Sequence, residues 1–269
     1  MSVVGIGLIP IFYFALLKIG IAHAATDSTD IKATSMSDPI GRYIDNVAFG
    51  VHEKLEFDIN YGFINAGTAT MEIPNVIEYQ GRPCFQVVTT ALSNSFFSSV
   101  YNVNDRAESI IDAVGIFSWR FEKNLREGSY SSDRQYDFDQ INHTTVYKED
   151  TIEVAEYVQD ALSMLYYIRT QELKPGTSFV LDNFVDGRKF STKVNILKKE
   201  KISVEAGTFD CIVVEPLMSS VGVFKHQGSL KVWLTDDRVK MPVLMKSKVI
   251  VGSISAELTK FSLGEIEEY

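Results

Sequence analysis

Most of the chain beyond residue 40 alternates between apolar and polar positions with a period of two, which is the pattern of β-strands that bury one face. The clearest run covers residues 55–63, and a second covers residues 69–73. The turn signal Asn-Ala-Gly at residues 65–67 lies between them, so the two runs are predicted to form an antiparallel hairpin. Further alternating runs cover residues 117–122, 190–196, 229–235, 243–251 and 254–261.

One segment changes to helical spacing. Apolar residues recur every three to four positions over residues 160–170, with Asp160 placed to cap the start and Arg169 in the last turn. Lys174-Pro175-Gly176 then ends the pattern. A short helix is therefore predicted here, whereas residues 93–100 are too rich in serine to be assigned.

These elements predict a mainly β fold. Asp186-Gly187 and Gly252 are hairpin turn signals, so the runs follow one another as antiparallel strands. Twist accumulates in such a long sheet, which should curl into a barrel, half-barrel or sandwich, with the one short helix plugging an end or lying on the concave face. Residues 40–261 contain no linker-like segment, so residues 40–269 are expected to form one domain.

The N-terminus has the pattern of an export signal. Residues 3–17 are apolar apart from glycines and Pro10, and the small residues around Ala24 fit cleavage after that position. No basic residue precedes the apolar run, so an uncleaved membrane anchor of about 20 residues is the alternative. We therefore predict a signal peptide over residues 1–24, a flexible tether over residues 25–39, and location in the periplasm of a Gram-negative bacterium. Membrane contact is expected only through the N-terminal segment, if it is retained.

Composition excludes some partners. The chain has 26 Lys plus Arg against 35 Asp plus Glu, a formal charge of −9, which argues against binding a nucleic-acid backbone. Only Cys84 and Cys211 are present, each in a strand-like run. In an exported protein two cysteines suggest one disulfide, but two separate buried thiols fit the sequence equally well.

Recognisable catalytic motifs are absent from the sequence. The histidines after the leader do not have zinc-site spacing, and neither a Gly-x-Ser-x-Gly elbow nor a nucleotide-binding loop occurs. We therefore expect no metal, no cofactor and no catalysis. The enzymatic alternative is a polysaccharide hydrolase, which needs two carboxyl groups across a sugar. The candidate pairs are Asp236 with Asp237, Asp137 with Asp139, and Asp182 with Asp186.

Aromatic and cationic residues in the alternating runs are candidates for ligand binding. Tryptophan can stack on a sugar or line a lipid cavity, and strand-borne cations can recognise a carboxylate or phosphate. Both types are also common in ordinary cores and on wet sheet faces. The candidates are Trp119, Arg120, Arg188, Lys231 and Trp233.

Several short strings resemble the DUF3108 family of exported bacterial proteins between about residue 55 and residue 261. They are Tyr61-Gly62 leading to Ala66-Gly67, Asp160-Ala161-Leu162-Ser163 leading to Tyr166-Tyr167-Ile168-Arg169, Val204-Glu205-Ala206-Gly207-Thr208-Phe209-Asp210-Cys211, Val232-Trp233-Leu234-Thr235-Asp236-Asp237, Met241-Pro242-Val243 and Lys248-Val249-Ile250-Val251-Gly252-Ser253-Ile254. The resemblance implies an exported, strand-rich domain and transfers no catalytic residues.

Three functions fit these observations. The first is an exported cell-envelope protein that binds an apolar or amphipathic ligand, or an envelope polymer, in the concavity of a curved sheet, because such sheets can enclose an apolar cavity. Lipid, lipoprotein or glycan of the envelope would then be its partner. The alternatives are the paired-carboxylate hydrolase and an assembly scaffold whose exposed strand edge pairs with another protein.

Overall fold

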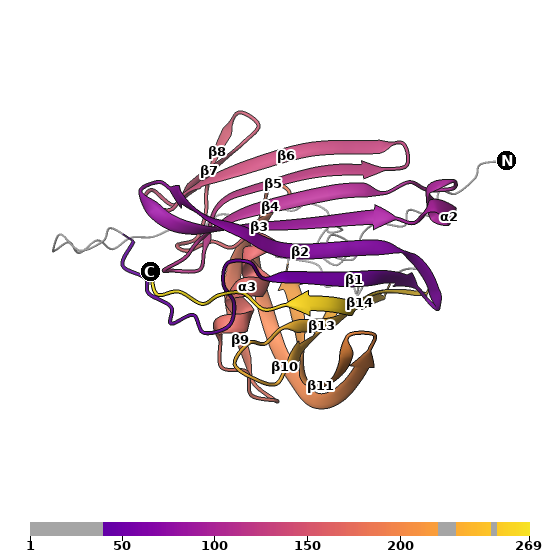
Figure 1. Ribbon diagram of the computed structural model, residues 1–269. Helices are drawn as coiled ribbons and strands as arrows, with labels where there is room; N and C mark the ends of the chain where they lie inside the picture. Colours follow the sequence, from indigo (N-terminus) through magenta and orange to yellow (C-terminus); the bar gives the residue numbers. More distant parts are fainter. Residues whose placement is uncertain (1–39, 220–229, 249–251) are drawn as a thin grey trace.

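The computed structural model describes residues 40–219, 230–248 and 252–269. Both the predicted signal peptide (1–24) and the predicted tether (25–39) lie outside the described residues. Within the described ranges, fourteen strands form one antiparallel sheet whose two edge strands, β8 and β9, are not paired with each other (Figure 1). The predicted mainly β fold is confirmed, and of the three forms expected it is the half-barrel, because the curled sheet is not closed.

The strands are β1 (Lys54–Tyr61), β2 (Ile64–Tyr79), β3 (Arg82–Ser93), β4 (Asn104–Asp112), β5 (Ser118–Glu127), β6 (Tyr130–Asp139), β7 (Thr144–Tyr147), β8 (Asp150–Glu153), β9 (Ser178–Val185), β10 (Arg188–Val204), β11 (Gly207–Ser219), β12 (Leu230–Thr235), β13 (Pro242–Lys248) and β14 (Ser253–Ser262). The described ranges also contain two helices, α2 (Ser95–Ser98) and α3 (Ser163–Thr170).

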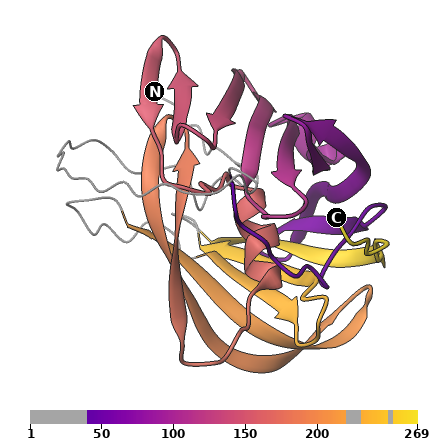
Figure 2. The ribbon, with the colours of Figure 1, turned by 90° about the vertical axis from the view of Figure 1, so that its left-hand side faces the viewer.

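The order of the strands explains where α3 lies. Strands β1 to β8 follow one another across one half of the sheet, β14 to β9 follow one another across the other, and β1 pairs with β14 between the halves. The chain therefore has to pass from one edge of the sheet, β8, to the opposite edge, β9. Helix α3 lies in this connection, and Figure 2 shows the sheet curled around it.

Helix α3 fills the part of the concavity that surrounds it. Four of its large side chains are buried in the main hydrophobic core, which also contains residues from β1–β3 and β10–β14. Tyr166, for example, packs edge-on against Phe49, with the ring centroids 4.7 Å apart. The sheet therefore does not enclose a continuous hollow, because α3 lies on its concave face, which is one of the two positions predicted for the helix.

Polar contacts hold both ends of α3. At its start, Asp160 Oδ1 accepts hydrogen bonds from the backbone N–H of Leu162 and Ser163, and its Oδ2 accepts one from Ser109 Oγ on β4 at 2.5 Å. At its end, the Arg169 guanidinium forms two hydrogen bonds with the Glu53 carboxylate, at 2.7 and 2.6 Å. The predicted helix is thus confirmed, although it starts at Ser163 and Asp160 caps the turn that precedes it.

Side chains close the gap between the two edges of the sheet. Phe184 of β9 packs against Tyr136 and Phe138 of β6, with ring centroids 5.3 and 5.9 Å apart. Next to these rings, the Lys123 ammonium of β5 pairs with the Asp186 carboxylate in the β9–β10 turn. The backbone of Gln159 also forms hydrogen bonds with Asp182 O and Phe184 N–H of β9, at 3.0 and 2.8 Å. The molecule is therefore a half-barrel whose long opening is filled by side chains and by the chain segment before α3.

The first hairpin differs from its prediction. Tyr61 pairs with Ile64, so the turn is the two-residue segment Gly62-Phe63, and residues 65–67 belong to β2. Gly62 has φ of +61°, which the first position of such a tight turn requires and which glycine adopts without strain. The predicted turn at Asp186-Gly187 is confirmed between β9 and β10. In the last hairpin, residues 249–251 of the predicted run lie outside the described residues.

Candidate functional site

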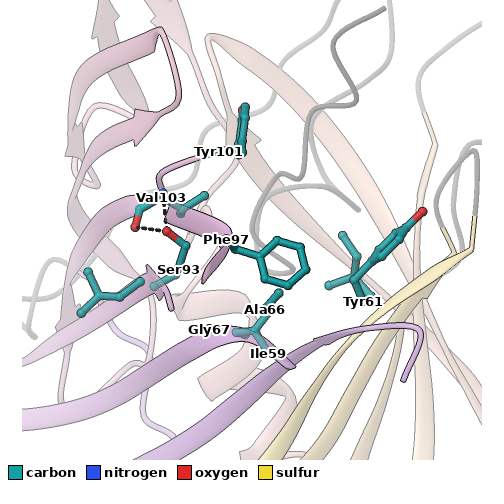
Figure 3. A pocket seen from close by; sticks show the side chains of 11 residues that line it. Ile59, Tyr61, Ala66, Gly67, Ser93, Phe97, Tyr101 and Val103 are labelled. Carbon is teal, nitrogen blue, oxygen red and sulfur yellow. Dashed lines mark hydrogen bonds between the residues drawn. The ribbon is translucent and has the colours of Figure 1, made fainter. Parts of the chain in front are cut away.

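One end of the half-barrel holds an apolar pocket, which we call the mouth. Its lining includes Ile59, Tyr61, Ala91, Phe97, Tyr101 and Ile254 (Figure 3). These residues come from β1, β3, β14, α2 and the segment after α2, and almost all of the lining surface is apolar. The cavity has a volume of about 50 Å³ and opens to solvent. Its chemistry suits a hydrocarbon group and offers few partners to a polar one.

The floor of the mouth depends on a close approach of β2 and β3. Gly67 pairs with Ser93, and a Cβ atom at residue 67 would lie 2.0 Å from the backbone oxygen of Leu92. Only glycine allows the two strands to come this close. The Ala66-Gly67 string noted in the sequence therefore has a structural role at the mouth.

Replacing Gly67 by alanine should destabilise the protein, because the new methyl group meets backbone atoms that cannot move aside. Overpacking of this kind costs about 1–3 kcal/mol. The exposed neighbour Thr68 is a control, since its replacement by alanine should change the free energy of unfolding by no more than about 0.5 kcal/mol. Urea unfolding of both variants measures the difference, and equal stability would show that the strands can separate locally.

Helix α2 forms one wall of the mouth. Asn94 caps it by accepting a hydrogen bond from the Phe97 N–H at 3.0 Å, and the Asn94 side chain also donates to the backbone oxygen of Asn65 at 2.8 Å. Ser93 Oγ accepts a hydrogen bond from Val103 N at 2.9 Å, which ties the chain after α2 to the end of β3. These contacts hold the Phe97 side chain toward the cavity (Figure 3). The serine-rich composition of this segment did not predict the helical turn that the structure shows.

Exposed apolar side chains surround the mouth. They lie in the β1–β2 turn, at the end of β3 and around α2, and we call them the collar: Phe63, Ile64, Leu92, Phe96 and Val100. Phe96 is 72% and Val100 is 82% exposed, and Phe63 is fully exposed. Isolated exposed apolar residues are common, but a concentration next to a pocket indicates a surface that contacts something apolar.

A pair of carboxyl groups lies on the inner side of β4 and β5. Asp105 and Glu127 are almost fully buried, and Asp105 accepts a hydrogen bond from Arg126 N at 2.7 Å. Burial, followed by the negative charge of Asp105, raises the pKa of Glu127 to about 8. Burial also raises the pKa of Asp105. Sequence reasoning missed this pair, because the two residues are 22 positions apart and meet only through the β4–β5 pairing.

A second, more polar pocket of about 720 Å³ lies at the opposite end of the half-barrel. Its lining includes Trp119, Asp137 and Asp139. Trp119 is nearly buried, and its Nε1 donates to Asp112 at 3.1 Å. Arg120, the neighbour of Trp119, pairs with Asp137 at 2.6 Å and lies over the ring of Tyr79. Trp119 and Arg120 are thus close to one another and to this pocket.

The other candidate ligand residues lie elsewhere, so the structure does not bring the five together. Arg188 is exposed at the start of β10. Lys231 and Trp233 are on β12, and Trp233 is buried, with its Nε1 donating to Glu200 Oε1 at 2.5 Å. Cys84 and Cys211 are buried free thiols on β3 and β11, which are not neighbouring strands, and burial raises the pKa of each thiol to about 12.

The acidic pairs considered from the sequence serve as turn and ion-pair groups. Asp236 pairs with Lys199, and Asp237 accepts hydrogen bonds within its own turn. Asp182 accepts a hydrogen bond from Ser191 at 2.6 Å, and Asp186 pairs with Lys123.

Asp137 and Asp139, which share the second pocket, both have a lowered pKa. For Asp137, hydrogen bonds from Gln135 and Arg120 outweigh the opposing effect of burial, and for Asp139 the lowering comes from hydrogen bonds donated by Asn142. Glycoside cleavage needs a general acid with a raised pKa, which neither residue provides.

The residues that the structure describes contain no group of three or more His, Cys, Asp or Glu residues arranged to hold a metal ion. Nor does any described helix combine the length and apolar character required to cross a membrane.

Comparison with solved structures supports the fold. A β-barrel-like protein of the domain of unknown function DUF1849 from Brucella abortus has a TM-score of 0.55 and 12% sequence identity, covering 81% of this chain and 100% of that one. At this identity the likeness shows the fold alone. The hypothetical protein CT021 from Chlamydia trachomatis has a TM-score of 0.36 and 4% identity, covering 81% and 90% of the two chains, which is too low to support an inference. No curated protein matches the chain.

Comparison with family models gives a match to DUF3108, a protein family of unknown function, over residues 56–259. The matched stretch begins in β1 and ends in β14, the two strands that join the halves of the sheet. It therefore includes both the mouth and the α3 segment that fills the concavity, and it agrees with the resemblance read from the short strings. Because the match covers most of the chain and the whole succession of strands, this protein belongs to the DUF3108 family.

Proposed function

We propose that this protein is an exported binding protein of the cell envelope that holds the end of an acyl chain, or a similar apolar group of an amphipathic ligand, in the mouth. The observation that carries this proposal is an apolar pocket, open to solvent, within a ring of exposed apolar side chains. Removing hydrocarbon from water provides the driving force, at roughly 25 cal/mol per Å² of buried apolar surface.

The size of the mouth limits what it can hold. Pockets that enclose whole small ligands have volumes of about 300–1,000 Å³, whereas the mouth has about 50 Å³. Because α3 fills the concavity further in, the rest of a long chain would have to remain outside. The proposed ligand is therefore anchored by its apolar end, with its polar part in solvent.

An acyl chain fits the mouth better than a glycan does. Sugars need hydrogen-bonding groups in addition to an aromatic face, and the lining is almost entirely apolar. The scaffold alternative also has less support, because the edge strand β8 is only four residues long and carries Asp150 and Glu153, and the other edge strand, β9, already forms backbone hydrogen bonds with Gln159. Short, charged edge strands discourage pairing with a further strand.

Filling the mouth should remove binding. Ala91 lines the pocket from β3, so Ala91→Leu places additional carbon atoms where the ligand end would lie. We expect the affinity for a fluorescent fatty acid, measured by titration of its emission, to fall about tenfold or more, which corresponds to about 1.4 kcal/mol.

The matched control is Ala155→Leu, because Ala155 is outside the pocket in the segment between β8 and α3. This variant should bind the probe as well as the original protein. Equal binding by the two variants, with both folded by circular dichroism, would contradict a ligand site at the mouth, as would a protein that takes up no fatty acid at all.

Export rests on the N-terminal sequence. An apolar stretch followed by small residues around Ala24 supports passage through the inner membrane and cleavage. The intact mass of the chain recovered from the envelope fraction of its host should correspond to residues 25–269. Recovery of the uncut chain in the membrane fraction would indicate the N-terminal anchor instead.

A further inference from the structure

The collar has no apolar cover within the described structure. Its members belong to separate segments that the fold brings to one end of the half-barrel, around the mouth. Tyr61 of the pocket pairs with Ile64 of the collar, and Phe96 contacts Phe97 of the pocket, with the ring centroids 5.5 Å apart. Collar and pocket therefore form one continuous apolar surface, so whatever covers the collar also faces the open mouth.

Positively charged side chains border this surface. The strand register places Lys246 opposite Lys231 on one side and Ser255 on the other, and places Lys248 opposite Ser253. Among the described residues, the register therefore places no acidic residue directly opposite Lys246 or Lys248. The Gly62 N–H donates to Ser253 O at 2.9 Å, which puts Lys248 one strand away from the β1–β2 turn of the collar. This local positive charge stands out in a chain with a formal charge of −9.

Exposed aromatic and aliphatic side chains next to lysines are the combination that binds a membrane surface. The apolar groups enter the boundary between headgroups and acyl chains, and the lysines remain at the level of the anionic headgroups. We propose that the collar docks on an anionic bilayer, with Phe63, Phe96 and Val100 entering its surface and the lysines facing the headgroups. This inference rests on the proposed function, in which an acyl chain enters the mouth. It deepens that function by naming the bilayer as the source of the acyl chain.

A fluorescent probe on the collar tests this docking in the full chain. Ser95 is exposed at the start of α2, so Ser95→Cys can carry an environment-sensitive nitrobenzoxadiazole label. The native Cys84 and Cys211 are fully buried and should not react. On vesicles of phosphatidylcholine and phosphatidylglycerol, the emission of the probe should shift to the blue and intensify. The same label at Thr151→Cys, on the exposed edge strand β8, should not respond.

Two further variants connect the response to the collar. The double substitution Phe63→Ser/Phe96→Ser should lower the apparent affinity of the labelled chain for vesicles about tenfold or more. The matched double substitution Ile141→Ser/Val180→Ser removes exposed apolar groups outside the collar and should leave the affinity unchanged. Because the probe reports the collar itself, an N-terminal segment that binds the vesicle independently does not produce the signal.

Several results would overturn the inference. One is a probe at residue 95 that does not respond to vesicles, and another is a response that survives the double collar substitution. A third is a dimer, seen by sedimentation without lipid, that the collar substitution dissociates, which would make the collar an interface between copies. Loss of vesicle docking with fatty-acid binding retained would contradict this inference alone. Docking by a chain that binds no fatty acid would contradict the proposed function alone.

Discussion

Replacing Arg169 by alanine is expected to lower the free energy of unfolding by about 3–5 kcal/mol, because the substitution leaves the Glu53 carboxylate buried without its partner. Both side chains are almost inaccessible to solvent, and two hydrogen bonds join them. Arg169 also donates to the backbone oxygen of Ala48 at 3.2 Å. Urea unfolding followed by circular dichroism measures the loss. Since the pair fastens the end of α3 to the chain before β1, the variant should also expose the core around α3.

An exposed ion pair provides the control. Arg126 and Asp133 are joined by two hydrogen bonds, but both side chains are about half exposed, so Arg126→Ala should lower the stability far less than Arg169→Ala does. Replacing Arg169 and Glu53 together by methionine should recover part of the stability lost in Arg169→Ala, because no unpaired charge remains. Equal losses from Arg169→Ala and Arg126→Ala would mean that the buried pair does not hold α3 in place.

Replacing Glu127 by glutamine is expected to stabilise the protein above neutral pH. The pKa of Glu127 is about 8 in the folded protein, against 4.5 as its ordinary value. Between these two values the folded state retains a proton that the unfolded state has lost, so stability should fall as the pH rises from about 4.5 to about 8. The slope should be at most about 1.4 kcal/mol per pH unit. Glutamine does not titrate, so the stability of Glu127→Gln should change much less over this range.

Urea unfolding at a series of pH values tests this expectation. The difference between Glu127→Gln and the original protein should be small near pH 5 and should grow to several kcal/mol at pH 8. Glu122, on the same strand but only partly buried, is the control, and Glu122→Gln should follow the original pH profile. A difference that is constant with pH would show that the pKa of Glu127 is not raised in the folded state.

The period-two pattern predicted the sheet because it records directly which residues face the core. In β10, for example, the alternation over residues 190–196 matches the buried positions of the strand, and the Asp186-Gly187 turn was assigned from local chemistry alone. The helix was predictable because its apolar residues recur at helical spacing in the sequence, although burial in the structure extends around most of the helix. The first turn was misplaced because Gly62 and residues 65–67 are both acceptable turn signals, and only the strand register selects between them.

The candidate site was far less predictable. Trp119 and Trp233 were candidates because tryptophan can stack on a sugar or line a lipid cavity. In the structure, each indole N–H donates to a carboxylate and each side chain is nearly buried. The mouth is instead built from ordinary residues, such as Ala91 and Ile254, that have no chemical signature in a sequence. The alternation over residues 55–63 predicted that Phe63 faces the core. In the structure Phe63 is fully exposed, because it lies in the turn.

By itself the sequence determined the mainly β class, the position of the helix and the membership of the family, since each depends on local periodicity or on strings of adjacent residues. The tertiary structure alone decided that α3 crosses the concavity from β8 to β9, that Asp105 meets Glu127, and that the collar surrounds the mouth. Those relations join residues far apart in the chain, and the curvature of the sheet and the pairing of its strands, which no local pattern encodes, determine which of them come into contact.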